Sequence, residues 1–321
     1  MPGFLTHYIA GQALLNAIEP QIREKIRQKP NSSSERLYNL GTQGPDIFFY
    51  YVPGHIRKRS RGVGTLMHQH DLGIFLMQMA HWSRLASESN GDRDILFAYT
   101  TGFIMHYVLD ANAHPYIYAK TQNDNMRKLK NSAKHRKFET ALDVTMLKLF
   151  SGEKPADYDQ WTLIDAESSH MSTVAVAMSR AIATVYGRVI PSKEAYQAMR
   201  YMVAGTKFLQ SKNGRRKRWM EIVEDLTIGE PLYSSMVHMQ SLPVKMRNDY
   251  LNTQKDPWHA PWAESEVFTD SFIERYEAAI KEGVKMIEHL YEYVYSDLES
   301  NTLADIFGNR SLKTGLPCKT L

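Results

Sequence analysis

The chain has 321 residues, of which 43% are hydrophobic and 23% are charged, and its formal net charge is +4. These values are typical of a globular protein with a sizeable core, and they exclude wholesale disorder. The single cysteine, Cys318, excludes a disulfide framework and a thiolate zinc site. The net charge is too small to indicate nucleic acid or a membrane surface as a partner by itself.

The first residues contain no recognisable targeting signal. Met1 to Thr6 lack a charged region followed by a long apolar stretch, and His7 interrupts the segment. No run in the sequence approaches the roughly 20 apolar residues that a spanning helix needs. We therefore expect a cytoplasmic protein without a transmembrane segment.

Apolar residues recur at helical spacing along most of the chain, beginning with Ile9 to Ile26. The same spacing predicts helices over 66–87, 94–109, 136–150, 171–187, 193–210 and 268–298. The segment 94–109 is apolar on most faces, as buried helices are, and Pro115 is expected to end it just after His114. The alternating pattern of strands is missing, so the sequence predicts an all-α fold formed by one multi-helix domain, 1–321. The charge run Lys212 to Arg218 is expected to be a solvated loop.

The clearest chemical feature is His106-Tyr-Val-Leu-Asp110-Ala-Asn-Ala-His114. Residues four apart share one face of a helix, so these side chains are expected to point the same way from a helix that is otherwise apolar. A buried carboxylate is costly unless it is paired. A metal ion that accepts imidazole and carboxylate together would stabilise it, and so would a hydrogen-bonded histidine–aspartate pair.

Four weaker features accompany this motif. His135 and Glu139 are also four residues apart, as chelating pairs and ordinary surface pairs both are. Gly41-Thr-Gln-Gly-Pro-Asp46 predicts a tight turn that presents Asp46 either to a metal or as a helix cap. His68 and His70 do not share a helix face, so at most one of them is expected to reach a site, and His7 precedes the first amphipathic helix.

Together these residues resemble the zinc-dependent phospholipase C family, whose all-helical fold is shared with single-strand-specific zinc nucleases. The matching residues follow the family order over roughly the first 140 residues, and 141–321 is expected to complete the fold with helices. They are Thr6-His7, Gly44-Pro45-Asp46, His68, Gly102 to Asp110, His114-Pro115 and His135 to Glu139.

The resemblance implies two or three bound Zn²⁺ ions. Asp46, His68, His106 and Asp110 would hold the first, and His114, His135 and Glu139 the second. His7 would form part of a third site that Asp110 bridges. In secreted members the amine and carbonyl of an N-terminal tryptophan also hold that third ion, whereas this chain begins Met1-Pro2.

The resemblance also implies hydrolysis of a phosphodiester, such as a phospholipid with its headgroup, by a metal-bound hydroxide that attacks phosphorus. Asp46 is the expected carboxylate that orients or deprotonates the water, and Glu139 is the second choice. One alternative is a zinc nuclease or phosphomonoesterase on the same fold, with the basic segments 120–137 and 215–218 following a nucleic-acid backbone. Another is a non-catalytic helical binding protein that zinc stabilises.

Overall fold

The structure is a computed structural model that describes residues 3–50, 60–122, 128–227, 234–238 and 249–318. The α-helices in these ranges are α1 (Phe4–Ala17), α2 (Pro20–Ile26), α3 (Ser33–Gly41), α4 (Val63–Gln69), α5 (Leu72–Leu85), α6 (Asp92–Thr121), α7 (Lys128–Ser151), α8 (Ser168–Tyr186), α9 (Ser192–Leu209), α10 (Arg215–Thr227), α11 (Phe272–Tyr295) and α12 (Ser300–Phe307). Short 3-10 helices are η1 (Gly44–Phe49), η2 (Pro155–Asp157), η3 (Gln160–Leu163) and η4 (Ser234–Met236). Within the same ranges, strands form a single antiparallel hairpin, β1 (Trp258–Ala260) and β2 (Ala263–Phe268). The prediction of an all-α fold is confirmed.

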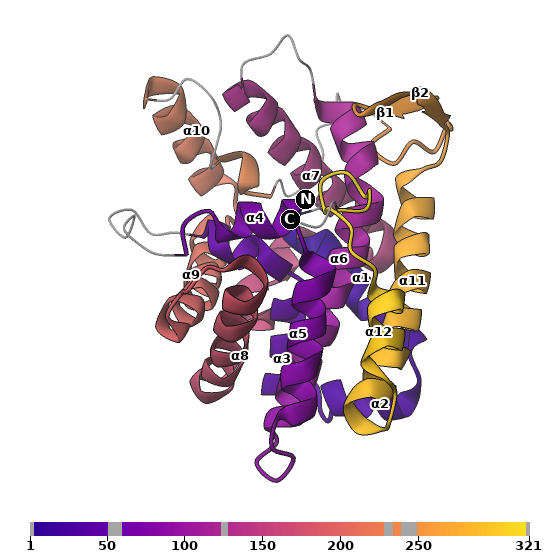
Figure 1. The fold of residues 1–321 in the computed structure, drawn as a ribbon. Coiled ribbons are helices and arrows are strands. Elements are labelled where there is room, and N and C mark those ends of the chain that lie inside the picture. The colour runs from indigo at the N-terminus through magenta and orange to yellow at the C-terminus, as the bar shows by residue number, and fades with distance from the viewer. Residues whose placement is uncertain (1–2, 51–59, 123–127, 228–233, 239–248, 319–321) are drawn as a thin grey trace.

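Helix α6 forms the centre of the molecule. It packs against α1, α2, α3, α5, α7, α8 and α11, and its residues from Ile95 to Ala111 are buried on all sides. Figure 1 shows α8 and α9 on one side of α5 and α6, and α11 and α12 on the other. A helix surrounded in this way has no polar face, as its sequence indicates.

Two glycines bring α3 unusually close to α6. A Cβ atom on Gly41 would lie 2.3 Å from the carbonyl oxygen of Tyr99, and one on Gly102 would lie 2.0 Å from that of Tyr38. Only glycine permits this approach of two backbones. It places the turn that follows α3 directly over the middle of α6.

The prediction that α6 ends just after His114 was wrong, because the helix continues through Pro115 to Thr121. Because proline has no N–H, the hydrogen bond that residue 115 would donate to the carbonyl of Ala111 is missing. The carbonyl of Asn112, one residue further along, accepts a hydrogen bond from Arg275 Nη1 at 2.8 Å. Tyr116 is fully buried and donates its hydroxyl to the Tyr250 carbonyl at 2.7 Å. Tertiary packing therefore outweighs the local preference for a helix end.

Two other boundaries differ from the sequence prediction. The helix expected over 66–87 is two helices, because Asp71 has a positive φ of 52° and accepts a hydrogen bond from Asn309 near the C-terminus. The charge run expected to be a loop begins as one, but Arg215–Arg218 form the first turn of α10. No helix in the described part of the chain combines the length and the apolarity that crossing a membrane would require.

Candidate metal centre

Three polar side chains lie on one face of the central helix α6. His106, Asp110 and His114 are four residues apart, and their exposed fractions are 0%, 0% and 2%. Their neighbours on α6 are predominantly apolar and buried. The core therefore contains a line of groups that each need a polar partner.

The Gly44-Pro45-Asp46 turn approaches this face from the end of α3. Gly44 has a φ of +51°, and a Cβ atom on it would lie 2.3 Å from the imidazole of His106. Both the left-handed backbone and the close contact require glycine. The turn continues into η1, where Asp46 Oδ1 lies 3.2 Å from His68 Nε2 of α4.

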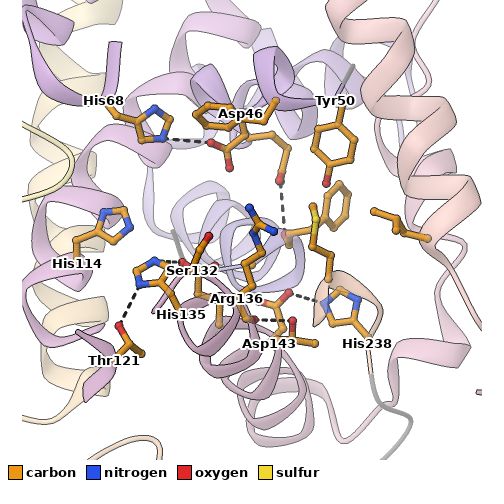
Figure 2. Close-up of a pocket in the computed structure, with 18 of the residues that line it drawn as sticks. Asp46, Tyr50, His68, His114, Thr121, Ser132, His135, Arg136, Asp143 and His238 are labelled. Carbon is orange, nitrogen blue, oxygen red and sulfur yellow. Dashed lines mark hydrogen bonds and ion pairs between the residues drawn. The ribbon is translucent and has the colours of Figure 1, made fainter. Parts of the chain in front are cut away.

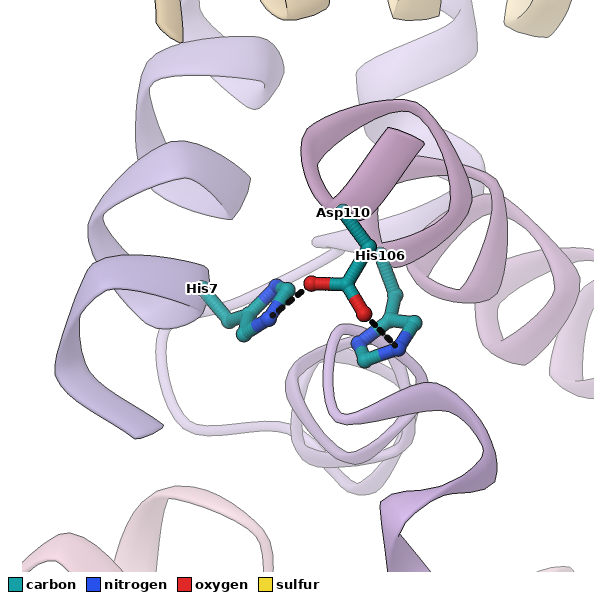
Figure 3. A group of neighbouring side chains, drawn as sticks. All are labelled: His7, His106 and Asp110. Carbon is teal, nitrogen blue, oxygen red and sulfur yellow. Dashed lines mark ion pairs between the residues drawn. The ribbon is translucent and has the colours of Figure 1, made fainter. Parts of the chain in front are cut away.

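The carboxylate of Asp110 lies among four imidazoles. Its Oδ1 is 3.2 Å from Nε2 of His7, and its Oδ2 is 3.2 Å from Nε2 of His106, 3.7 Å from Nδ1 of His114 and 4.0 Å from Nε2 of His68. Figure 3 shows His7 and His106 on either side of the carboxylate, and their stacked rings have centroids 4.4 Å apart. Asp110 is thus the hub of the cluster.

The side chains form three groups in which the ligand atoms lie within 4.8 Å of one another. These groups are His7, His106 and Asp110; Asp46, His68 and His106; and His114, His135 and Glu139. All eight residues proposed as zinc ligands from the sequence are brought together here. His106 is shared by two groups.

The third group is more open than the other two. His135 Nε2 on α7 lies 2.6 Å from Glu139 Oε1, and the ring of His114 stacks on that of His135 with centroids 5.9 Å apart. The side chains of His135 and Glu139 retain some exposure, whereas those of His7 and Asp110 have none.

Four of the imidazoles share a common orientation. In each, Nδ1 faces an oxygen of the surrounding shell, and Nε2 of His68, His106 and His135 faces a carboxylate of the cluster. The pairs are His68 with the Gly64 carbonyl (2.6 Å), His106 with the Thr42 carbonyl (3.1 Å), His114 with the Leu312 carbonyl and His135 with the Thr121 hydroxyl (3.1 Å). A carbonyl can only accept, so Nδ1 carries the hydrogen in the first three rings. Metal-ligating histidines are oriented in the same way.

The charges of the cluster favour a cation. Burial raises the pKa of Asp110, but the neighbouring His114 and His106 outweigh burial and hold that pKa well below its ordinary value. Burial lowers the pKa of His7 and of His114. Asp110 therefore favours its carboxylate form and His7 and His114 their neutral form, which are the forms in which these groups ligate metals, whereas Asp110 raises the pKa of His106.

The donor atoms fit zinc. His7 Nε2, His106 Nε2 and both oxygens of Asp110 are buried and make no aligned hydrogen bond within the described ranges. Orphaned atoms of this kind are rare in folded proteins. Nitrogen and oxygen donors that converge without thiolates suit zinc, which accepts imidazole and carboxylate.

A cavity of about 950 Å³ adjoins the cluster. Asp46, His68, His114, His135 and Glu139 line it, whereas the fully buried His7, His106 and Asp110 do not. Figure 2 shows a second set of polar side chains in the same cavity, which includes Tyr50, Arg136, Asp143 and His238. Both sets are therefore accessible from one cavity.

Sequence reasoning missed Asp143 and His238. Asp143 is fully buried and accepts hydrogen bonds from the backbone N–H of Leu5 (3.0 Å) and from the N–H and hydroxyl of Thr6 (2.8 and 2.6 Å). It also pairs with His238 Nε2 at 2.6 Å. Asp143 thus ties the first turn of α1, which carries His7, to α7. Its spacing of four residues from Glu139 was a usable signal, whereas nothing in the sequence marked His238.

The fold and the site define a class, that of all-helical proteins in which one central helix supplies a histidine–carboxylate metal centre. The model of one family, zinc-dependent phospholipase C, matches residues 6–196. The chain belongs to this family of phospholipase C-like hydrolases. No curated protein and no solved structure gives a significant match.

Proposed function

We propose that this protein is a zinc-dependent phosphodiester hydrolase of the phospholipase C type. The observation that carries the proposal is the carboxylate of Asp110, which is fully buried and within 4.0 Å of four imidazole nitrogens beside a large cavity. Family membership supports the same reaction class. A purely structural role would not need a cavity lined by the candidate ligands.

The three groups of side chains would hold two or three zinc ions. Asp110 would bridge the ion near His7 and the ion near His68, while His114, His135 and Glu139 would hold another. Bound zinc would lower the pKa of a water towards neutrality and neutralise charge on the phosphoryl oxygens.

Asp46 is the carboxylate that we expect to orient and deprotonate the attacking water. It lines the cavity, and its Oδ1 is held 3.2 Å from His68 Nε2. Glu139 is the second candidate, because it lines the same cavity beside His135. Carboxylates that also ligate metals are weaker bases, so the two roles must be separated by experiment.

Other lining residues of the cavity are suited to the non-reacting part of a phosphodiester. Arg136 contributes a guanidinium group to this cavity, and Gln160 and His238 contribute further hydrogen-bonding groups. Guanidinium groups bind phosphate oxygens well because their N–H donors are fixed in a plane.

The test is hydrolysis by zinc-loaded protein of three substrates: p-nitrophenylphosphorylcholine, a short-chain phospholipid and single-stranded DNA. We expect zinc-dependent cleavage of the first two. Asp305→Asn, an exposed carboxylate on α12, is the control for Asp110→Asn. Cleavage of DNA alone would favour the nuclease, and no cleavage of any substrate by zinc-loaded protein would favour the non-catalytic binding protein.

A further inference from the structure

Helix α10 has two sides of opposite character. One side faces the protein, with Met220 and Glu224 buried. Glu224 accepts hydrogen bonds from the N–H and hydroxyl of Ser234 (3.1 and 2.5 Å), and Lys217 Nζ donates to the carbonyls of Ser234 (2.6 Å) and Val237 (2.8 Å). These polar contacts fix which side of the helix is turned outward.

The outward side carries an apolar stripe. Trp219, Ile222, Val223 and Leu226 follow helical spacing, and all four are exposed, Trp219 by 62% and Leu226 by 81%. No described residue covers them. Scattered exposed apolar residues are ordinary, but a contiguous stripe on one helix face indicates a surface that binds a membrane or another molecule.

Positive charge gathers at the start of α10, beside the stripe, and the exposed Glu221 and Asp225 follow it along the helix. Arg215 and Arg218 are exposed in the first turn and form no ion pair with a described residue. The exposed Lys130, Lys134 and Lys137 follow one another along α7. Helices α7 and α10 both pack against η4, and Lys137 of α7 is near enough to Lys217 to add to the effect of burial in lowering its pKa.

The stripe lies near the cavity. η4, to which α10 is bonded, continues into His238, and both Met236 of η4 and His238 line the cavity. Leu209 and Gln210, which precede α10, line it as well. Figure 1 shows α10, the start of α7 and the β1–β2 hairpin at the same end of the molecule.

We infer that α10 is an interfacial helix that inserts its apolar stripe into the surface of an anionic phospholipid membrane. An amphipathic helix with an aromatic residue on its apolar face and basic residues beside it binds at the boundary of headgroups and acyl chains. Anionic lipids attract the arginines and the lysines of α7. The choice of a lipid surface rests on the proposed function, since the cavity beside α10 would then receive a headgroup from the same membrane.

The experiment is co-sedimentation of the zinc-loaded protein with vesicles of phosphatidylcholine, with and without phosphatidylserine. We expect binding to the vesicles that contain phosphatidylserine. Leu226→Glu should weaken it about tenfold or more, because it places a charge where a leucine would be buried. Arg218→Gln should weaken it about fivefold, and added salt should have a similar effect.

The matched control is Leu85→Glu. Leu85 is also highly exposed, at 61%, and it ends α5 at the opposite end of the molecule. Leu85→Glu should leave vesicle binding unchanged. Circular dichroism would verify that both variants fold.

Insertion can be located with brominated lipids. They should quench part of the tryptophan fluorescence of the wild-type protein, and this quenching should be lost in Trp219→Phe, which keeps an apolar ring on the stripe. Trp219→Phe should still bind the vesicles.

Equal vesicle binding by Leu226→Glu, Leu85→Glu and wild-type protein would overturn the inference. So would self-association of wild-type protein that Leu226→Glu abolishes without any vesicle binding, because the stripe would then be covered by a second copy. Hydrolysis of p-nitrophenylphosphorylcholine, a soluble substrate, tests the proposed function separately, and Leu226→Glu should not change it.

Discussion

Asp110, at the centre of α6, is a charged side chain with no exposed surface, whereas Leu226 on α10 is an apolar side chain that is 81% exposed. Each reverses the usual distribution of side chains in a folded protein. The buried carboxylate needs a cation or a proton, and the exposed leucine needs an apolar surface. Both exceptions are explained by ligands: a cation held inside the protein by Asp110, and an apolar surface outside it that covers Leu226.

The largest effect is expected at Asp110. Asp110→Asn keeps the size of the side chain and removes its charge, so we expect hydrolysis to fall more than about a hundredfold. Mutation of a residue that only hydrogen-bonds a metal ligand already lowers metal affinity or activity by up to about that factor. Added zinc should raise the thermal midpoint of the wild-type protein and not that of the variant. Differential scanning calorimetry with and without zinc measures this.

A smaller loss is expected at the open third group. His135→Ala should remove one zinc ion and lower hydrolysis by about tenfold to a hundredfold, because the groups around Asp110 remain. Glu139→Gln should match His135→Ala if Glu139 is only a ligand, and should be worse if it is the base. Steady-state kinetics of the two variants beside Asp46→Asn separates the roles; equal, complete inactivation by all three would contradict the division into groups.

Asp143 should matter for stability more than for chemistry. Asp143→Asn places an amide N–H₂ among the N–H groups of Leu5 and Thr6 and the ring of His238, and should lower the free energy of unfolding by about 2 kcal/mol. Urea unfolding measures this change, with Asp305→Asn as the exposed control. An unchanged midpoint would mean that the N-terminus of α1 does not depend on this carboxylate.

The smallest expected effect is a dependence on pH in zinc-free protein. Burial lowers the pKa of His7 and of His114, so the unfolded chain binds protons more readily than the folded one as pH falls below about 6.5. The stability contributed by these neutral rings is present above that pH. It is lost as the pH falls towards and through the pKa values that the two rings have in the folded protein. His106 acts in the opposite direction, because Asp110 raises its pKa against burial. Thermal midpoints between pH 5 and 8 should therefore fall modestly towards acid, and a flat or rising profile would contradict this assignment.

The sequence was sufficient to predict the helical class and to select the residues that now lie together. Periodicity along α6 and the spacing of His106, Asp110 and His114 are local properties, and local spacing fixes which side chains share a helix face. The turn at Gly44 could be recognised from its residues, although its contact with His106 could not, because that contact depends on how α3 packs against α6.

Features set by distant contacts were not predictable. Pro115 lies inside α6, where Tyr116 and Arg275 make tertiary hydrogen bonds beside it, and Asp71, at the break in the helix expected over 66–87, accepts a hydrogen bond from the distant Asn309. On α10, apolar periodicity would normally indicate the buried side. There the protein binds the helix through Lys217 and Glu224 instead, so the apolar stripe faces outward.

The most direct test of the central claim is the number of zinc ions bound to each chain. Elemental analysis of zinc-loaded, exhaustively dialysed protein should give two or three ions for the wild type and fewer for Asp110→Asn, with Asp305→Asn equal to the wild type. A wild-type protein that retains no zinc, or an Asp110→Asn variant that retains the full number, would contradict the assignment of Asp110 as the hub of a metal centre.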